Sequence, residues 1–465
     1  MPAKDKANTD KKASRREFLI NGTRTAAGLW AAGTLASCAS THPDSLPKGR
    51  VMGANERINL AVIGIKGRGR SHAKGFARIP GVRVATLCDV DTNLFADRVR
   101  DLSGQEGGPP STEQDIRRVL EDKTIDAVAI ATPDHWHSLA TIWACQAGKH
   151  VYVEKPCSHN IRESRKMVEA AAKYRCMVSV GFQNRSLKNV RQAMKFLHDG
   201  GIGEVYMARG LCFKPRDSIG REKDCPVPAG VDYNLWLGAA PDRPFNPNRF
   251  HYNWHWMWEY GCGDIGNQGP HQFDIARWGL NKKEHPVSIR SEGGYFAWDS
   301  DQETPNTQAA TLKYADGKIL SFEVRGLYTN DENSIRIGNL FYGTKGWMHL
   351  NGSNWKTYFG RKNEPGPTNK TVEEAADPMN LAGAGGGGHY ANFIYALRSG
   401  KQEDLTCAIE EGHMSTALPH LANIAYRVGR DLTFDGNSER FVDNDEADRL
   451  LTRSYREPFV VRENV

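Results

Sequence analysis

A chain of 465 residues is too long for one ordinary hydrophobic core and predicts two or three domains. Its 39% hydrophobic and 25% charged residues are ordinary for a soluble globular protein. The net charge of +6 comes largely from the first fifty residues. No Lys/Arg run in the rest of the chain indicates a phosphate-binding patch, so we expect no nucleic-acid partner.

The first 38 residues predict an export signal. Arg15 and Arg16 are followed by Phe18-Leu19 and then by an Ala/Gly-rich apolar run from Ala26 to Ala36, which is typical of the twin-arginine route. The run is well short of the ~20 residues that a bilayer-spanning helix needs, so we expect no permanent membrane segment. This route exports folded proteins, commonly with a cofactor inside.

Leu35-Ala36-Ser37-Cys38 at the end of this run resembles a bacterial lipobox. We expect Cys38 to be lipidated after cleavage, with simple cleavage nearby as the alternative. Residues 39–56, which contain Pro43, Pro47 and Gly49, predict a linker. The expected location is therefore periplasmic, with attachment to the membrane only through the lipid on Cys38.

Eight of the nine cysteines remain if Cys38 is consumed, and none of them forms a CxxC pair. Cys88, Cys145 and Cys176 lie in apolar segments, where free buried thiols are common. We predict no disulfide framework, although an oxidising compartment permits one. Cys212 and Cys225 are the one pair that we would test for a disulfide bond.

A glycine-rich turn follows the first predicted strand. Ile58 to Ile63 is a near-continuous apolar strand, and a helix-like segment runs from Ser71 to Arg78. Between them, the middle position of the G-x-G-x-x-G pattern is occupied by Lys66. Such a turn lets a helix N-terminus approach a pyrophosphate, with a purely structural βαβ turn as the alternative. The residues expected at the pyrophosphate are Gly64, Lys66, Gly67, Arg68 and Gly69.

A second strand, Val82 to Asp89, ends on a carboxylate. Asp89 follows Gly64 by twenty-five residues, which is near the distance expected for an acid that binds the ribose hydroxyls. A carboxylate there repels a 2′-phosphate, so we expect NAD rather than NADP as the cofactor.

The next strand end continues the predicted cofactor edge. A helix is expected from Glu113 to Leu120 and a strand from Ala127 to Ala131, which leads into Thr132-Pro133. The nicotinamide ribose would pass beside Thr132 and Pro133. His137 precedes a helix expected from Ser138 to Ala147, and it either contacts the cofactor or caps that helix.

The strand His150 to Val153 runs directly into Glu154-Lys155-Pro156. Because Pro156 prevents a helix across this motif, Lys155 is held at a strand end. Open α/β sheets bind ligands beyond the carboxyl ends of their strands, which makes Lys155 a candidate catalytic residue. The alternative is a surface lysine that pairs with Glu154.

Together these motifs resemble the Gfo/Idh/MocA oxidoreductases. The matching elements are the Gly64–Gly69 turn, Asp89, Thr132-Pro133, Ala147-Gly148-Lys149-His150-Val151 and, most specifically, Glu154-Lys155-Pro156. The resemblance implies an NAD-binding Rossmann domain over residues 57–182. It also implies that Lys155 points at the nicotinamide and the reacting hydroxyl. The other candidates for cofactor contact on this edge are Thr132, Pro133, His137 and Glu154.

A second domain with a different pattern follows, which we place at residues 183–440, before a C-terminal tail at 441–465. The resemblance implies an α+β fold with an open, mainly antiparallel sheet, and short turns between the predicted strands agree with this. Helices are expected at 187–198, 390–397 and 409–430. The predicted strands are 205–213, 287–298, 309–314, 319–324 and 347–350.

The segment Phe245–Trp258 alternates aromatic rings with Asn, Arg and His. Aromatic faces stack on sugars while polar groups hold hydroxyls, so we interpret it as a sugar-binding wall, with interdomain packing as the alternative. His251, His255 and Glu259 repeat at four-residue spacing, but the tryptophans favour an irregular loop, and we expect no metal. The residues expected at the substrate here are Arg249, His251, Tyr252, Trp254 and His255.

A second motif, Gly261–Asp274, follows directly. The resemblance assigns an acid/base role to His271 and places Asp274 at the substrate, whereas the position of the usual assisting aspartate is occupied by Asn267. An amide cannot take a proton, although it can orient a hydroxyl. The expected catalytic residues are therefore Lys155, His271 and Asn267.

The resemblance implies an NAD-dependent dehydrogenase acting on a sugar, polyol or glycoside. Because free NAD is scarce outside the cytoplasm, we expect an exported enzyme to retain the nucleotide between turnovers. One alternative is a glycosidase that uses bound NAD for transient oxidation, but the relatives with that activity lack the lysine of the Glu-Lys-Pro motif. A second alternative is a non-catalytic sugar-binding lipoprotein. Because an open sheet face commonly pairs in such proteins, we expect a homo-oligomer.

Overall fold

The computed structural model describes residues 48–50, 53, 56–352, 354–373 and 388–465. The chain divides into the units Met1–Ser45 and Leu46–Val465, and the described residues all belong to the second unit. The predicted signal at 1–38, the lipidation site Cys38 and most of the 39–56 linker lie outside them. No helix in the described part of the chain is long and apolar enough to cross a bilayer.

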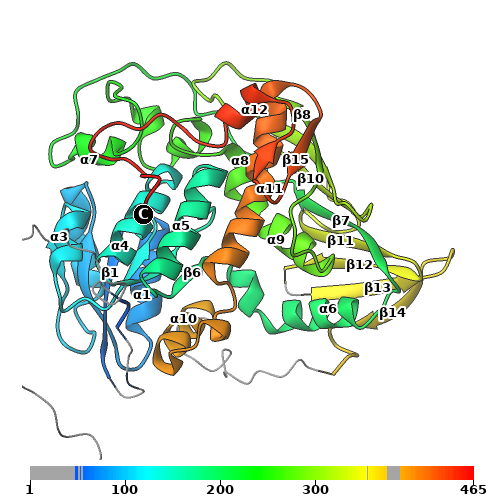
Figure 1. Cartoon of the computed structure of the whole chain (residues 1–465), viewed down its shortest axis with the longest axis horizontal. Helices are drawn as coiled ribbons and strands as arrows, with labels where there is room; N and C mark the ends of the chain where they lie inside the picture. The colour runs from blue at the N-terminus through cyan, green and yellow to red at the C-terminus, as the bar shows by residue number, and fades with distance from the viewer. Residues whose placement is uncertain (1–47, 51–52, 54–55, 353, 374–387) are drawn as a thin grey trace, which may run out of the picture. The chain divides into compact units, whose positions relative to one another are not determined.

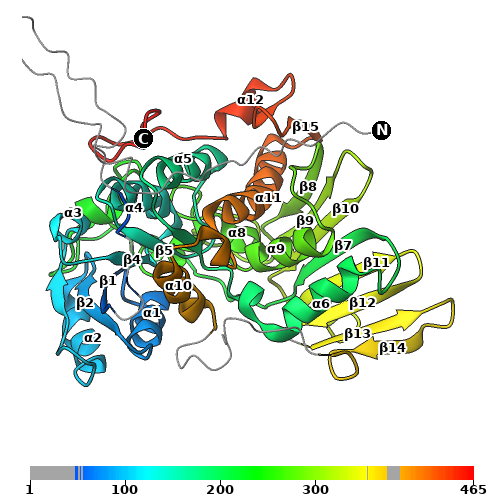
Figure 2. The same ribbon diagram turned by 60° about the horizontal axis from the view of Figure 1, so that its bottom comes forward.

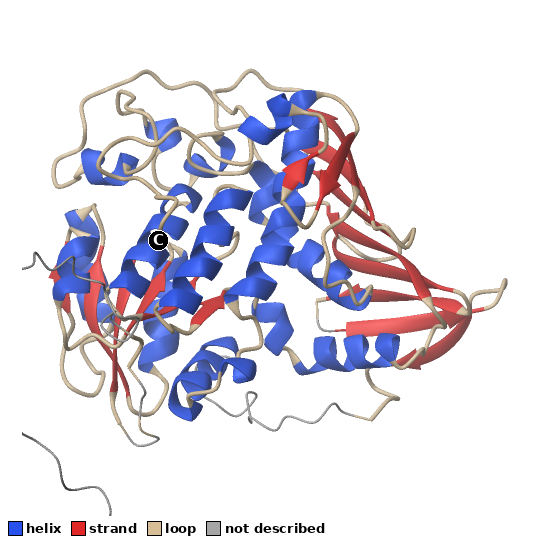
Figure 3. Ribbon diagram, in the orientation of Figure 1, coloured by secondary structure: helices blue, strands red, loops and turns tan. Residues whose placement is uncertain are grey.

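The first domain is built on a parallel six-stranded sheet with the order β3-β2-β1-β4-β5-β6. Strands β1, β4 and β5 are almost completely buried, as expected for a sheet with helices on both faces. Figure 3 shows these strands between helices. The strands are β1 (Ile58–Ile63), β2 (Val82–Cys88), β3 (Ser111–Glu113), β4 (Ala127–Ile130), β5 (His150–Val153) and β6 (Val178–Val180).

Two apolar clusters cover the two faces of this sheet. One joins β1 and β2 to α1 (Arg68–Ala77), α2 (Phe95–Asp101) and α10 (Gly388–Ser399). The other joins the sheet to α3 (Ile116–Glu121), α4 (Asp134–Gln146) and α5 (Ile161–Lys173). Both clusters take residues from the end of the chain. Phe393 of α10 lies in the first cluster, and Phe459 and Val465 lie in the second.

The second domain is organised around a ten-stranded sheet with the order β14-β13-β12-β11-β7-β10-β9-β8-β15-β16. Only the β7–β10 pair in it is parallel among the described strands. The two-domain fold predicted from the sequence is confirmed. The strands are β7 (Val205–Cys212), β8 (Ser288–Gly294), β9 (Thr307–Lys313), β10 (Ile319–Arg325), β11 (Ile337–Gly343), β12 (Gly346–Asn351), β13 (Asn354–Phe359), β14 (Glu364–Thr368), β15 (Leu432–Asp435) and β16 (Arg440–Phe441).

One face of the large sheet is covered by α6 (Lys188–His198), α9 (Gly269–Gly279) and α11 (Ile409–Val428), which Figure 2 shows between the two sheets. Strands such as β9 alternate buried and exposed residues. On the other face of the sheet, Leu211, Phe213, Ile335 and Leu340 form a small buried cluster. The short helices α7 (Tyr233–Leu237) and α8 (Gly263–Asn267) lie in the long connection from β7 to α9, and α12 (Asp445–Arg449) follows β16.

Several local predictions were wrong. The helix expected from Ser138 begins at Asp134. The helix expected to begin at Glu113 begins at Ile116, because Glu113 ends β3 and the Asp115 side chain accepts a hydrogen bond from the amide of Arg117. The strand expected to reach Trp298 ends at Gly294. Strands β11, β13, β14, β15 and β16 were not anticipated.

Cys212 is buried, Cys225 is exposed, and both are free thiols.

A buried ion pair connects the helices beneath the large sheet. Arg185 donates to both carboxylate oxygens of Asp274 on α9 at 2.7 to 2.9 Å, and Ser415 of α11 donates to the same carboxylate at 2.6 Å. The Arg185 and Asp274 side chains are only 6% and 1% exposed. The pair therefore fixes α9, which carries His271, against α11.

Replacement of Asp274 by Ala is expected to lower the stability of the second domain by about 3 kcal/mol, because the Arg185 charge stays buried with Glu411 as its remaining carboxylate partner. Urea unfolding followed by tryptophan fluorescence measures this. The control is Asp199→Ala, whose exposed pair with Lys195 contributes less than about 0.5 kcal/mol. Equal losses in the two variants would contradict the assignment.

Candidate active site

A cavity of about 530 Å³ lies where the carboxyl ends of the first sheet meet the second domain. The first domain contributes the ends of β1, β2, β4 and β5, and the second domain contributes residues between Leu235 and His271. Ligands of open α/β sheets bind at this edge, and the volume is that of a small-molecule site.

The glycine turn at the cavity fits a pyrophosphate. A β-carbon on Gly69 would lie 1.7 Å from the carbonyl oxygen of Gly64, so only glycine permits this close approach of α1 to the strand end. A β-carbon on Gly67 would meet nothing within 4 Å, because the backbone there faces open space. Gly64, Lys66, Gly67 and Arg68 line the cavity, whereas Gly69 packs behind them.

Asp89 lies at the ribose end of the turn. Its carboxylate accepts hydrogen bonds from the backbone amides of Ile65 at 2.7 Å and Asp91 at 3.0 Å. Burial raises the pKa of Asp89 to about 6, against the effect of these two bonds. Asp89 lines the cavity, where an ionised carboxylate would repel the 2′-phosphate of NADP.

The end of β4 contributes Thr132, Pro133 and His137 to the cavity wall. The Thr132 hydroxyl is buried without a hydrogen-bond partner, which leaves it available to a ligand. The ring nitrogens of His137 lie 2.7 Å from the carbonyl oxygen of Pro156 and 2.9 Å from that of Thr132. His137 therefore connects two strand ends and does not cap α4, whose N-cap residue is Pro133.

Glu154 is enclosed by three donors from two segments, α1 and the loop after β6. Its Oε1 atom lies 2.8 Å from Nε of Arg68, 2.9 Å from Nε2 of His72 and 2.9 Å from Nε2 of Gln183. Burial alone would raise the pKa of Glu154, but these donors and the neighbouring charges lower it well below its usual range. Glu154 is therefore a permanent negative charge beside the cavity.

Lys155 extends from the first domain to the second. Its Nζ atom donates to the carbonyl oxygen of Asn267 at 2.7 Å and lies 3.4 Å from the side-chain oxygen of the same residue. Burial lowers the pKa of Lys155, and the Glu154 and Asp134 carboxyl groups oppose this effect. The structure thus places Lys155 in the cavity and not on the surface.

His271 lines the same cavity from the first turn of α9, and Asn267 lines it from the end of α8. Burial, followed by the Lys155 charge, lowers the pKa of His271 to about 3. Its Nδ1 atom is buried without a partner. A neutral imidazole with a free nitrogen is able to accept a proton.

The predicted substrate residues divide into two groups. His251, Tyr252, Trp254 and His255 line the cavity, and the His255 ring stacks on Trp254 with centroids 3.6 Å apart.

The structure does not bring Arg249 or Asp274 to the cavity wall. The Arg249 guanidinium lies 3.4 Å from the Asp224 carboxylate and donates to the carbonyl oxygen of Pro244. Asp274 faces Arg185 and α11, because α9 is packed between the sheet and α11. The expectation that Asp274 contacts substrate is corrected to a structural role.

The alternative metal site is not assembled, because its three members have separate partners. His251 faces Asp91 at 3.3 Å, His255 lies 2.5 Å from the carbonyl oxygen of Tyr252, and Glu259 pairs with Arg243.

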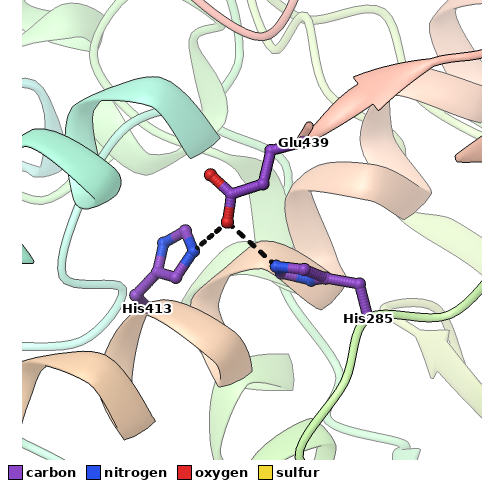
Figure 4. A group of neighbouring side chains, drawn as sticks. All are labelled: His285, His413 and Glu439. Atoms are coloured by element: carbon purple, nitrogen blue, oxygen red, sulfur yellow. Dashed lines mark hydrogen bonds and ion pairs between the residues drawn. The ribbon is translucent and has the colours of Figure 1, made fainter. Parts of the chain in front are cut away.

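A different polar trio, His285, His413 and Glu439, lies away from the cavity (Figure 4). One Glu439 oxygen lies 2.6 Å from Nε2 of His413 and 3.1 Å from Nε2 of His285. Arg165 donates to both oxygens, so the carboxylate charge is already compensated. We assign the trio to a hydrogen-bonded connection between α11, α5 and the β15–β16 turn.

Several cavity residues were missed by the sequence analysis. Asp134 begins α4 directly after Thr132-Pro133, is 2% exposed and lines the cavity. Burial raises its pKa well above the usual range, and the Lys155 charge opposes this. Its position directly after a strand end was an available signal. Gln183, Leu235 and Trp236 carried no comparable signal, because only the tertiary fold brings them to the cavity.

Family models match both domains. Residues 58–182 match the model described as oxidoreductase family, NAD-binding Rossmann fold, and residues 218–461 match the model described as oxidoreductase family, C-terminal alpha/beta domain. The chain therefore belongs to the Gfo/Idh/MocA oxidoreductase family, and its first domain is an NAD-binding Rossmann fold.

Sequence relatives include enzymes of two kinds. A glycosyl hydrolase family 109 protein of Saccharopolyspora erythraea is 31% identical over 207 residues, which are 42% of this chain and 45% of the relative. Levoglucosan dehydrogenase of Pseudarthrobacter phenanthrenivorans is 29% identical over 48% of this chain and 51% of the relative. Myo-inositol 2-dehydrogenase of Thermotoga maritima is 27% identical over 38% of this chain and 48% of the relative. The chain spans about half the length of these relatives.

Solved structures show the same fold. Levoglucosan dehydrogenase in complex with NADH and levoglucosan has a TM-score of 0.61 at 18% identity, covering 81% of this chain and 99% of that one. Aldose-aldose oxidoreductase from Caulobacter crescentus, complexed with glycerol, has a TM-score of 0.60 at 18% identity. The match covers 82% of this chain and 100% of that one. At these identities the likeness concerns the fold alone.

Replacement of Asp89 by Asn is expected to increase the affinity for NADP relative to NAD at least tenfold, because the 2′-phosphate no longer meets a carboxylate. Since the wild-type carboxyl is ionised above a pKa of about 6, its discrimination against NADP is strongest above pH 7 and falls toward pH 5. Calorimetric titration with both nucleotides measures this. Asp97→Asn, in an exposed part of α2, is the control. An unchanged affinity ratio would contradict the role of Asp89.

Proposed function

We propose that this protein is an NAD-dependent oxidoreductase that transfers a hydride between a hydroxyl of a sugar, polyol or glycoside and a retained nicotinamide nucleotide. The observation that carries the proposal is that Lys155, Asn267 and His271 line one cavity together with the glycine turn and Asp89. Sugar and polyol dehydrogenases among the relatives support the substrate class.

Residues of both domains divide the work on the substrate hydroxyl. His271 is neutral at physiological pH and takes the hydroxyl proton. Lys155, oriented by the carbonyl oxygen of Asn267, stabilises the alkoxide that develops as the proton leaves. The Asn267 amide orients the hydroxyl. When bound, NAD supplies the acceptor for the hydride from the carbinol carbon.

Tyr252 and the stacked Trp254–His255 pair form the part of the cavity wall that we assign to the carbohydrate. Aromatic rings cover the apolar face of a sugar while nearby polar groups bind its hydroxyls. We extend the proposal to a periplasmic, lipid-anchored protein on the basis of the Arg15-Arg16 and Cys38 motifs. In that compartment the nucleotide is reoxidised in place, by a second carbonyl substrate or by a redox-neutral cycle.

The open face of the large sheet is the surface that we propose for self-association. Aromatic side chains occur on strands there: Tyr206 is 50% exposed, and Trp347 and Tyr358 stack with centroids 4.4 Å apart. Sedimentation velocity tests this. A monomer at micromolar concentration would contradict the proposal.

Replacement of Lys155 by Met is expected to lower the rate of hydride transfer by about 10²–10³-fold, because a preorganised positive charge is lost from the developing alkoxide. The nucleotide is expected to remain bound. NADH absorbance in single turnovers over a sugar panel measures the rate, and mass spectrometry of the purified protein measures the nucleotide. The control is Lys123→Met, an exposed lysine outside the cavity. A rate unaffected by Lys155→Met would remove the proposed role.

The second candidate function is glycoside cleavage through transient oxidation, which the glycosyl hydrolase family 109 relatives favour. Lys155 of the Glu-Lys-Pro motif favours the dehydrogenase. An assay with nitrophenyl glycosides that measures both NADH and released aglycone distinguishes the two functions. Net NADH with intact glycoside supports the dehydrogenase, whereas aglycone release without net NADH supports the glycosidase. Binding of a sugar without either reaction supports a non-catalytic binding protein.

A further inference from the structure

The aromatic-rich connection of the second domain does not lie wholly at the substrate. Its first part, residues 228–251, which we call the strap, crosses to the first domain. Its helix α7 lies beside α4 (Figure 1), and Trp136 of α4 donates to the carbonyl oxygen of Leu235 at 3.0 Å. The indole ring of Trp136 lies 2.5 Å from where a β-carbon on Gly238 would be, so only glycine permits this contact.

Strap residues and the loops after β2 and β3 line one end of the cavity. Val90, Gln114 and Ile116 come from the first domain and follow the ribose-binding position Asp89. Leu235, Trp236, Phe250 and His251 come from the strap. This end lies beyond Asp89, away from Lys155 at the nicotinamide end. Its mixture of apolar and aromatic side chains fits a planar, weakly polar base.

We propose that the adenine half of the nucleotide binds in a pocket completed by the second domain, and that the strap must move before the nucleotide leaves. The inference rests on the proposed use of NAD, but it adds adenine-binding residues and a cause for nucleotide retention. The strap is thus part of the cofactor site, and the substrate wall is restricted to the following residues, 252–255.

Hydrogen bonds fasten the strap to the loop after β2. Thr92 donates from its amide and from its hydroxyl to the carbonyl oxygen of Gly230, both at 3.0 Å. Asn93 donates from its side chain to the carbonyl oxygen of Ala229 at 2.9 Å. The amide of Asp232 donates to the carbonyl oxygen of Val90 at 2.9 Å. The beginning of the strap is therefore attached beside the adenine pocket.

The far end of the strap contacts the same loop through His251, whose imidazole is neutral near pH 7 because burial lowers its pKa to about 4. Nε2 of His251 lies 3.3 Å from the carboxylate of Asp91. Asp91 is itself held in place, because it accepts hydrogen bonds from the amide and side chain of Asn93. Both ends of the strap therefore contact one loop beside the adenine pocket.

The experiment measures the release of bound nucleotide from the holoprotein. Protein carrying isotopically labelled NAD is mixed with excess unlabelled NAD, and the label retained is followed by mass spectrometry. The double variant Thr92→Val/Asn93→Ala removes the side-chain attachments from an exposed loop. It is expected to release NAD at least about tenfold faster, as the loss of two hydrogen bonds implies. Asp97→Ala on the neighbouring α2 is the control and is expected to match the wild type.

A second variant removes the attachment at the other end. His251 has a left-handed backbone with φ of 55°, so His251→Asn keeps a residue that tolerates this conformation while it removes the imidazole. Its release rate is also expected to rise, with an unchanged melting temperature of the nucleotide-free protein. Excess ADP-ribose is expected to displace the label, whereas nicotinamide mononucleotide is not, because the closed pocket recognises the adenine half.

Release rates in both variants equal to that of the wild type would overturn the inference, and so would a wild type that binds no NAD. The second result would also overturn the proposed function. In contrast, slow, strap-dependent release from a protein that oxidises no sugar would support the strap and contradict only the proposed reaction.

Discussion

The buried carboxylate of Glu154 is the interaction on which the candidate site depends. It is charged inside the protein because Arg68, His72 and Gln183 all donate to it. Those donors come from α1 and from the segment after β6, so one side chain fixes the relative positions of the glycine turn and two strand ends. Space for it is restricted as well, since a β-carbon on Gly181 would lie 2.9 Å from the carboxyl group.

The charge of Glu154 also influences the pKa of the adjacent residue, Lys155. Lys155 is in a buried environment that lowers its pKa, and an adjacent permanent carboxylate opposes that effect. Asp134 adds a second carboxyl group near the same ammonium, and burial favours its neutral form. Beside Asn267 the cavity therefore contains the negative charge of Glu154, the Lys155 ammonium and the buried acid Asp134.

The connection from β7 to α9 joins the two halves of the site. One part contacts the first domain near Asp91, the next part supplies Tyr252 and His255, and the last part leads to Asn267 and His271. A single segment of the second domain therefore follows the cavity from the ribose end to the reacting end. The cavity wall is consequently built by both domains together.

The sequence by itself determined the features that depend on local pattern: the strand–glycine turn–helix unit, the strand ending at Asp89, and Lys155 held at a strand end by Pro156. Only the tertiary structure decided the partners of residues that no local pattern relates. It placed Asp274 against Arg185, brought Asp134 to Lys155, and brought His251, Tyr252, Trp254 and His255, but not Arg249, to the cavity wall. It also brought α10 and Phe459 back to the first domain and added the outer strands of the large sheet. The physical reason is the distance along the chain over which each signal acts. Turn and strand signals act over a few residues, whereas these contacts join segments tens to hundreds of residues apart and depend on how whole elements pack.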